Sequence, residues 1–169
     1  MIRRILILFF LLSGQTFADW PAWRHDRART GASAEAPPER ANLIWQLNMG
    51  KPEPAYDHQF RMCADRAPAP VATNGTVFIP SATGDQVLAC SLASGKIVWR
   101  FVTEGPVRFA HVVADGKVIF GCDDGYLYAV GTVTGELIWK TRGVDPSFPD
   151  SRMLINDRMG SRWPVRGAA

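Results

Sequence analysis

A repeat of about forty residues constrains the fold of this chain more than any other feature of its sequence. Residues 74–79 recur as residues 115–120 at an offset of 41, and residues 94–100 recur as residues 134–140 at an offset of 40. Self-similarity at a period of roughly 20–50 residues is typical of solenoids, propellers and repeat arrays. The chain is therefore expected to fold as stacked copies of one supersecondary unit.

Each repeat divides into four short β-rich runs separated by turn residues. Asn74-Gly75 and Asp115-Gly116 separate the first run from the second, and such dipeptides favour two-residue hairpins because both turn positions adopt positive φ. The predicted strands are residues 69–73, 76–81, 86–91 and 96–102 in the first repeat, and 108–114, 117–122, 126–130 and 136–141 in the second. We predict an all-β fold, a partial β-propeller of two four-stranded antiparallel blades plus edge strands of other blades.

The repeats divide the chain into five parts. They are a signal peptide at 1–18, a lead-in at 19–66 with a closing strand near 42–48 and an insertion loop after it, a first blade at 67–102, a second blade at 103–142, and an insertion loop with the truncated start of a third blade at 143–169. The insertions at 50–66 and 143–162 match neither repeat. We interpret them as loops that bind a partner or serve only as ordered connectors.

The first eighteen residues have the composition of a secretory signal peptide. Arg3 and Arg4 precede an unbroken apolar run at 5–12, and Ala18 supplies a small residue for cleavage. A membrane-spanning helix needs about 20 apolar residues, which this run does not provide. We therefore expect cleavage after Ala18, a secreted or periplasmic product, and no membrane span after cleavage.

The net charge indicates which partners to expect, and the cysteine count indicates whether to expect disulfides. Arg3 and Arg4 account for most of the formal net charge of +3, so the mature chain is nearly neutral and we predict no nucleic-acid partner. The odd count of three cysteines argues against a disulfide framework in an oxidising compartment. We interpret Cys90 and Cys122 as small buried residues, with one facultative bridge left open.

Both repeats contain a motif that ends in tryptophan. It reads Ala-x-Ser-x-x-Ser-Gly-Lys-x-x-Trp at 89–99 and Ala-x-Gly-x-x-Thr-Gly-Glu-x-x-Trp at 129–139. These stretches resemble the tryptophan-docking motif of pyrroloquinoline-quinone-like (PQQ-like) repeat β-propellers, which has Asp where this chain has Ser91 and Gly131. The resemblance implies that six residues dock successive blades: Ala89, Gly95, Trp99, Ala129, Gly135 and Trp139.

The resemblance extends to both sides of the two repeats. Residues 19–24 and 29–31 are similar to the lead-in of secreted bacterial proteins of this type, and residues 43–47 resemble a closing strand with Trp45 in the place of Trp99. Residues 164–168 echo residues 106–110, as if a third blade begins there. We therefore expect an N-terminal fragment whose partners include the missing C-terminal blades, and which alone is unstable or self-associates through unpaired strand edges.

Two functions remain open under this resemblance. BamB-like propellers are non-enzymatic scaffolds, whereas quinoprotein alcohol dehydrogenases hold PQQ and calcium and cover the cofactor with a disulfide between adjacent cysteines. No two cysteines are adjacent here, and no cluster of oxygen ligands suited to calcium is apparent. We predict a scaffold that binds other proteins of the cell envelope, without catalytic residues, metal or cofactor. The alternative is a fragment of a PQQ-dependent dehydrogenase.

Arg108 and Arg166 are the candidate binding residues. Each follows a Pro-Val pair at the start of a predicted inner strand, which would direct two guanidinium groups to one rim of the central channel. The alternative is an arginine paired with a carboxylate or carbonyl of a neighbouring blade. We interpret Asp123 and Asp124 as hairpin-turn residues, and His111 as packed or exposed to solvent.

Overall fold

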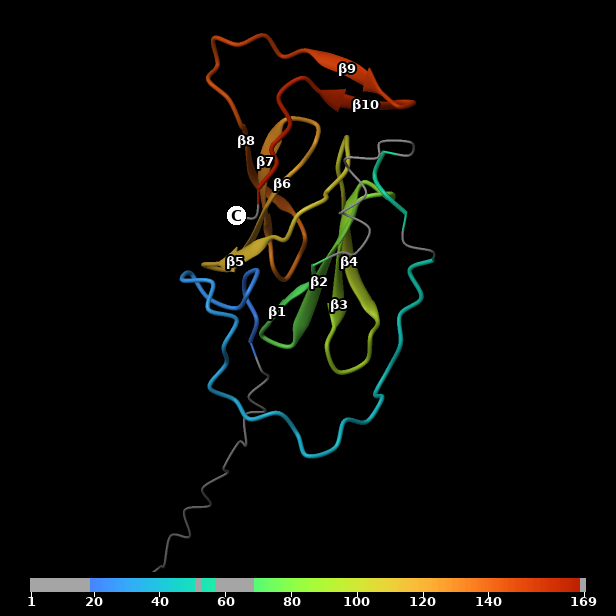
Figure 1. Cartoon of the computed structure of the whole chain (residues 1–169), viewed down its shortest axis with the longest axis vertical. Helices are drawn as coiled ribbons and strands as arrows, with labels where there is room; N and C mark the ends of the chain where they lie inside the picture. The colour runs from blue at the N-terminus through green and yellow to red at the C-terminus, as the bar shows by residue number, and fades with distance from the viewer. Residues whose placement is uncertain (1–18, 51–52, 57–68, 168–169) are drawn as a thin grey trace, which may run out of the picture.

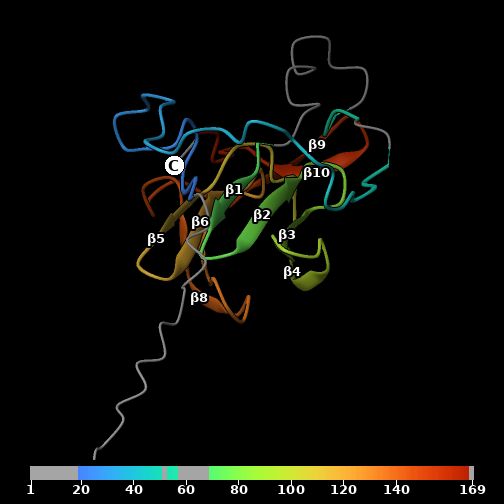
Figure 2. The same cartoon turned by 90° about the horizontal axis from the view of Figure 1, so that it is seen from below.

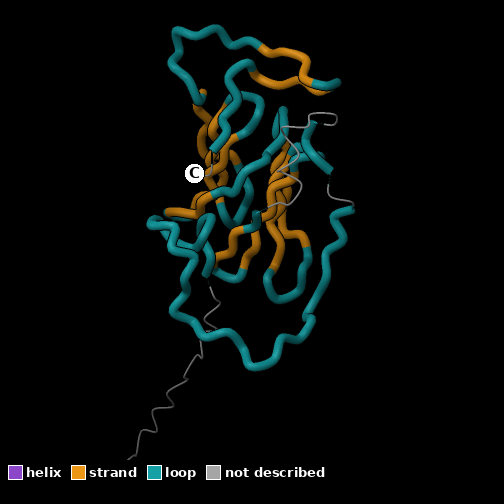
Figure 3. The backbone as a smooth tube through the Cα atoms, in the orientation of Figure 1, coloured by secondary structure: helices purple, strands orange, loops and turns teal. Residues whose placement is uncertain are grey.

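The computed structural model describes residues 19–50, 53–56 and 69–167 (Figure 1). Within these ranges all regular structure is β-strand, as the colouring of Figure 3 shows, and no helix suited to crossing a membrane is found there. The strands form two four-stranded antiparallel sheets and one two-stranded hairpin. The prediction of an all-β partial propeller is confirmed. The predicted signal peptide at 1–18 lies outside the described residues.

The two sheets repeat each other closely. The first is ordered β1-β2-β3-β4 and the second β5-β6-β7-β8, and the last strand pair of each shows the same register shift, after Ala89 and after Ala129. Their strands are β1 Val71–Thr73, β2 Thr76–Ser81, β3 Gln86–Ser91 and β4 Ile97–Val102, then β5 Val112–Ala114, β6 Lys117–Gly121, β7 Tyr126–Gly131 and β8 Leu137–Arg142.

The opening strand of the second sheet is shorter than predicted. We expected residues 108–114, and β5 covers only the last three of them. Pro106 has no N–H to donate to a ladder, and its carbonyl accepts a hydrogen bond from the Asp123 N–H at 3.0 Å, in the turn between β6 and β7. The segment before β5 is thereby tied to the end of the sheet instead of extending it.

The N-terminal lead-in joins the innermost strands of the two sheets. Trp20 forms an antiparallel bridge with Ala72 of β1, and the Pro21 carbonyl accepts a hydrogen bond from the Val113 N–H of β5 at 2.8 Å. From there the lead-in runs around to the outer side of the first sheet, as Figures 1 and 2 both show. It therefore fixes the inner edges of both sheets relative to each other.

Aromatic side chains from both sheets form the core between them. The rings of Phe120 and Tyr128 stack with centroids 5.4 Å apart, and Phe101 of the first sheet meets them edge-on at 6.0 and 5.7 Å. Trp99 lies 5.7 Å from Phe78 and is 8% exposed. Burying a side chain of this size stabilises a fold by about 1.5–3 kcal/mol. The contact between the sheets is thus the main core of the described chain.

Trp99 contacts the second sheet through a hydrogen bond and a close ring contact. Its indole Nε1 donates to the Thr132 carbonyl at 2.9 Å, and its ring lies so near Gly135 that a Cβ there would approach the ring to 2.6 Å. Trp45 contacts the first sheet in the same way, with Nε1 donating to the Leu92 carbonyl at 2.6 Å and its ring equally close to Gly95. A glycine in a left-handed turn is therefore needed beneath each indole.

Two expectations about this docking differ from the structure. Residues 42–48 form no strand, because no described sheet edge pairs with them, although Trp45 still docks. Trp139 is 37% exposed instead of packed between blades, because no described sheet packs against its side of β8. The other docking residues are placed within the contacts: Ala89 and Ala129 are fully buried beside Trp99 and Trp139 in the strand pairs.

We had predicted a loop for the insertion at 143–162. The insertion instead contains a β-hairpin. Strand β9 (Arg152–Ile155) pairs with β10 (Arg158–Ser161), and Asn156 and Asp157 between them both have positive φ, at 45° and 64°. Asn and Asp tolerate this conformation best among non-glycine residues. The hairpin lies across one end of both sheets, at the top of Figure 1.

Ion pairs from this hairpin reach the first sheet and the segment between the sheets. Arg158 pairs with Asp85 in the β2–β3 turn and donates to the carbonyls of Ala82 and Ala55, at 3.0 and 2.7 Å. Arg152 pairs with Glu104 in the segment that joins the two sheets. The insertion is thus held against both blades by charged contacts.

Candidate binding site at the inner rim

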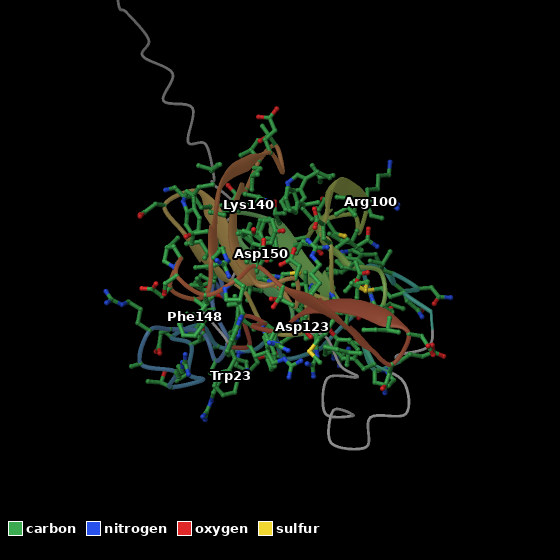
Figure 4. The ribbon with its side chains drawn as sticks, turned by 90° about the horizontal axis from the view of Figure 1, so that it is seen from above. Trp23, Arg100, Asp123, Lys140, Phe148 and Asp150 are labelled. Carbon is green, nitrogen blue, oxygen red and sulfur yellow. The ribbon has the colours of Figure 1, made fainter. Side chains whose placement is uncertain are left out.

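Asp123 is the centre of a group of polar side chains at one end of the two sheets. It lies in the β6–β7 turn, where its N–H donates to the Pro106 carbonyl at 3.0 Å and its carbonyl accepts from the Ser161 N–H at 2.8 Å. Its side chain is 1% exposed. Figure 4 shows Asp123 alongside the β9–β10 hairpin, seen from above. The backbone contacts hold the carboxylate in a fixed position.

Arg108 and Arg166 contact the two oxygens of this carboxylate. Arg108 Nη1 lies 3.3 Å from Asp123 Oδ2, and Arg166 Nε lies 3.4 Å from Asp123 Oδ1. The structure thus brings together the two arginines singled out in the sequence, in the ion-paired form that was the alternative to a free channel rim. Their side chains are 6% and 32% exposed, so Arg166 alone has substantial contact with solvent.

Tyr56 completes this group, which we call the rim cluster: Tyr56, Arg108, Asp123 and Arg166. Its side chain is fully buried, and the Arg108 guanidinium lies 5.6 Å from its ring centroid. Burial raises the pKa of the Tyr56 hydroxyl, and the Asp123 carboxylate raises it further. The hydroxyl therefore stays protonated beside the Asp123 carboxylate.

The roles of Asp123 and Tyr56 were not predicted from the sequence. Asp-Asp-Gly is a turn signature, and the structure confirms the turn, but the same turn also delivers a buried carboxylate. The repeated Pro-Val-Arg at 106–108 and 164–166 was the available signal, because two equivalent arginines at one rim need a shared anion. Tyr56 has no counterpart in either repeat, and no sequence pattern pointed to it.

Asp124 serves a separate set of contacts. Its carboxylate accepts hydrogen bonds from the Tyr126 N–H at 3.0 Å and the Tyr128 hydroxyl at 2.5 Å. Burial, followed by this hydrogen bond, raises the pKa of Tyr128. Asp124 therefore closes the turn and orients an aromatic ring of the core.

The described residues do not fit the calcium site of a quinoprotein. Calcium takes six to eight oxygen ligands. The rim cluster offers one carboxylate flanked by two guanidinium groups, which repel a divalent cation, and Asp124 is engaged by two hydrogen bonds. No group of three or more potential metal ligands occurs in the part of the chain that the structure describes.

Two further reactive side chains are buried between the sheets. Burial lowers the pKa of His111 to about 4. The Cys122 thiol donates to the Gly105 carbonyl at 3.2 Å, and burial raises its pKa. Cys90 and Cys122 are both free thiols, and Cys63 lies outside the described residues. The structure places His111 as a neutral packed residue.

A comparison with protein families shows to which family this chain belongs. The family described as outer membrane protein assembly factor BamB matches residues 35–157, which is more than half of the chain. The chain belongs to this family. Its two described sheets are accordingly blades of a PQQ-like repeat β-propeller. No curated protein sequence matches the chain.

One solved structure shows the same fold, and a second is similar to a smaller part of the chain. Quinohemoprotein alcohol dehydrogenase from Comamonas testosteroni is 21% identical, with a TM-score of 0.50, over 78% of this chain and 20% of that chain. BamB from Moraxella catarrhalis is 25% identical, with a TM-score of 0.39, over 43% of this chain and 22% of that chain. The chain thus spans about a fifth of the length of either structure.

Proposed function

We propose that this chain is part of a non-enzymatic, secreted or periplasmic propeller that acts as a scaffold for other proteins of the cell envelope. Membership of the family of an outer membrane assembly factor supports this proposal. The rim cluster supports it as well, because Arg108 and Arg166 are both ion-paired with the buried Asp123 carboxylate. These ion pairs hold the two arginines against the β6–β7 turn.

The β9–β10 hairpin carries the proposal, since it departs from the repeat and presents an apolar surface. Leu154 and Met159 are cross-strand partners on one face of it and are 66% and 50% exposed. Met153 on the other face is 46% exposed. Ion pairs from Arg152 and Arg158 hold this surface in place, so little ordering entropy is lost when a partner binds. We infer that an envelope protein docks on this hairpin.

Site-specific photo-crosslinking in the producing cell tests the scaffold function. A crosslinking residue at Met159 is compared with one at Val133, which is 81% exposed in the β7–β8 turn and outside the hairpin. We expect Met159 to give one discrete adduct with an envelope protein, and Leu154→Asp to abolish it. Equal labelling from both positions, or an adduct that survives Leu154→Asp, would contradict docking on the hairpin.

The competing function, a PQQ-dependent dehydrogenase, makes a different prediction. The protein isolated from its producing cell would bind PQQ in the presence of calcium, seen as a change in the quinone absorption spectrum, and would reduce a dye with an alcohol as substrate. We expect neither signal. Stoichiometric quinone binding together with alcohol-dependent dye reduction would replace the scaffold function with the enzymatic one.

A further inference from the structure

We propose that a cavity on the outer side of the first sheet binds a small organic acid whose carboxylate is attached to an aromatic ring through a short alkyl arm. The cavity has a volume of about 230 Å³ and lies between the lead-in at 47–49 and the strands β3 and β4. Its lining includes Leu47, Gln86, Leu88, Ile97 and Arg100. No residue of the rim cluster lines the cavity, so the two sites are separate.

The second sheet shows why this space is open in the first. Trp45 docks on the first sheet as Trp99 docks on the second, so the two contacts can be compared position by position. Beside Trp99, the space is filled by the rings of Phe101, Phe120, Tyr126 and Tyr128. The equivalent positions beside Trp45 have Leu47, Ile79, Gln86 and Leu88. The first sheet therefore has a cavity where the second sheet has an aromatic cluster.

Arg100 is the only ionisable side chain among the residues that line the cavity. It lies across the strands from Leu88, as Lys140 lies across from Tyr128 in the second sheet, and Figure 4 labels both cations. The Lys140 ammonium is 4.7 Å from the centroid of the Tyr126 ring, a distance at which the ring face attracts a cation. The repeat thus places a cation beside a ring, and the first sheet has the cation without the ring.

The Arg100 guanidinium also has no counter-ion in the ranges that the structure describes. No ion pair, hydrogen bond or ring contact joins it to another residue there. Asp85 in the adjoining β2–β3 turn is paired with Arg158. The Cys90 thiol near Arg100 is uncharged, because burial raises its pKa. A guanidinium offers two parallel N–H donors to a carboxylate. Arg100 can therefore bind an ionised acid without losing an existing contact.

The size and the walls of the cavity define the rest of the ligand. Leu47, Leu88 and Ile97 supply apolar surface for a ring, and Leu88 is only 6% exposed. An apolar cavity of about 150 Å³ accommodates benzene. The cavity of about 230 Å³ thus has room for one ring and a short acidic arm. The arm lets the carboxylate turn out of the ring plane, toward a guanidinium that lies over the ring. These features favour an arylacetate.

Calorimetric titration of the protein isolated from its producing cell tests this inference with three compounds of similar shape: phenylacetate, cyclohexylacetate and phenylacetamide. Phenylacetate should bind about threefold more tightly than cyclohexylacetate, which has the charge without the aromatic ring. It should bind about tenfold more tightly than phenylacetamide, which has the ring without the charge. Equal affinities for phenylacetate and either of the other two compounds would overturn the proposal.

Variants of two lining residues locate the binding. Arg100→Gln should weaken phenylacetate binding by about tenfold or more, and Arg100→Lys by less, because it keeps the charge without the planar fork. Gln86→Tyr introduces the residue that the second sheet has at this position, and its ring should fill the cavity and block the ligand. Lys96→Gln is the matched control, since Lys96 is an exposed cation of the same sheet that does not line the cavity. Its affinity should be unchanged.

Unchanged phenylacetate affinity in Arg100→Gln would overturn the inference, as would an equal loss in Lys96→Gln. Circular dichroism checks that each variant is folded, and Arg100→Gln decides alone if Gln86→Tyr is not, because Arg100 is exposed. The inference does not depend on the scaffold function, since no residue of the β9–β10 hairpin lines the cavity. Loss of the crosslink at the hairpin with retained phenylacetate binding would remove the scaffold function alone, and the reverse result would remove the cavity site alone.

Discussion

The two sheets present equivalent faces that have very different surroundings. On the face of the first sheet that carries Trp99, Phe78 and Val87 are fully buried and Trp99 is 8% exposed, because the second sheet covers them. On the corresponding face of the second sheet, Trp139 is 37% exposed and Leu137 beside it is 46% exposed. The same motif therefore specifies a docking surface in both sheets. Its tryptophan becomes buried only where a neighbouring sheet covers it.

Trp45 shows an intermediate case. It docks on the first sheet with the hydrogen bond and the glycine contact that Trp99 makes on the second, yet the chain around it forms no strand. Leu43 and Ile44 beside it are 83% and 80% exposed. An indole can thus contact a blade in this way without the strand pairing that accompanies the contact in a complete blade.

Replacement of Trp99 and of Trp139 by alanine should give the largest difference in stability between the two faces. Trp99→Ala removes a buried ring from the core and is expected to lower the free energy of unfolding by about 3–5 kcal/mol. Trp139→Ala removes a partly exposed ring and should cost under about 1 kcal/mol. Urea denaturation followed by circular dichroism measures both. Equal losses in the free energy of unfolding would mean that something covers the face of the second sheet that carries Trp139 in solution.

Substitution of Gly135 tests the contact beneath Trp99. Gly135→Ala combines a positive φ of 71° with a Cβ only 2.6 Å from the indole, and we expect a loss of about 2–4 kcal/mol. Gly116→Ala is the control, because φ is also 71° there but nothing lies within 4 Å of the added Cβ. Its loss should be about 1 kcal/mol. Thermal unfolding ranks the two variants, and similar melting temperatures would refute the close contact.

Acid should weaken the contact between the sheets through His111. Burial lowers its pKa to about 4 from an ordinary value of 6.5, so the unfolded chain takes up the proton first as the pH falls. Stability from the neutral ring is complete above about pH 6.5 and decreases toward pH 4, by up to about 3 kcal/mol. Urea midpoints between pH 7 and pH 4 measure this, with His111→Gln as reference. Parallel curves for the two proteins would exclude His111 as the cause.

Trp45→Phe should give the smallest change in the free energy of unfolding. It isolates the indole hydrogen bond by which Trp45 contacts the first sheet. The variant keeps an aromatic ring against Gly95 but removes the donor to the Leu92 carbonyl. We expect a loss of about 0.5–1.5 kcal/mol in the free energy of unfolding. Trp99→Phe, which removes the equivalent donor to Thr132, is the comparison. A loss of the same size in both would show that the hydrogen bond, and not the surrounding strand, determines the dock.

Local patterns in the sequence predicted the strands well. The predicted ranges 76–81 and 86–91 coincide with β2 and β3, because Asn-Gly and Ser-Gly turns set their ends and β-branched or apolar residues fill them. The β9–β10 hairpin was missed, since its Asn156-Asp157 turn lies between short runs that contain arginines and a glycine. It becomes stable through ion pairs with residues far away in the chain, and no local pattern records them.

The rim cluster was predictable only in part. The repeated Pro-Val-Arg pattern identified Arg108 and Arg166 as equivalent, and the structure joins them through Asp123. The position of Tyr56 depends on the course of the lead-in around the first sheet, which has no repeat and no periodicity. Long-range contacts of this kind are set by the whole fold, and a single sequence without a repeated copy gives no signal for them.

The bridge from Trp20 and Pro21 to the inner strands has a consequence for the order of assembly. These residues leave the ribosome before either sheet exists, yet their partners Ala72 and Val113 belong to the two successive repeats. The earliest segment must therefore wait until the opening strand of the second repeat has been made. Closure of the inner edge is then a late and slow event, because it joins distant parts of the chain. Until that moment, both inner strands remain open to chaperones and to misplaced strands.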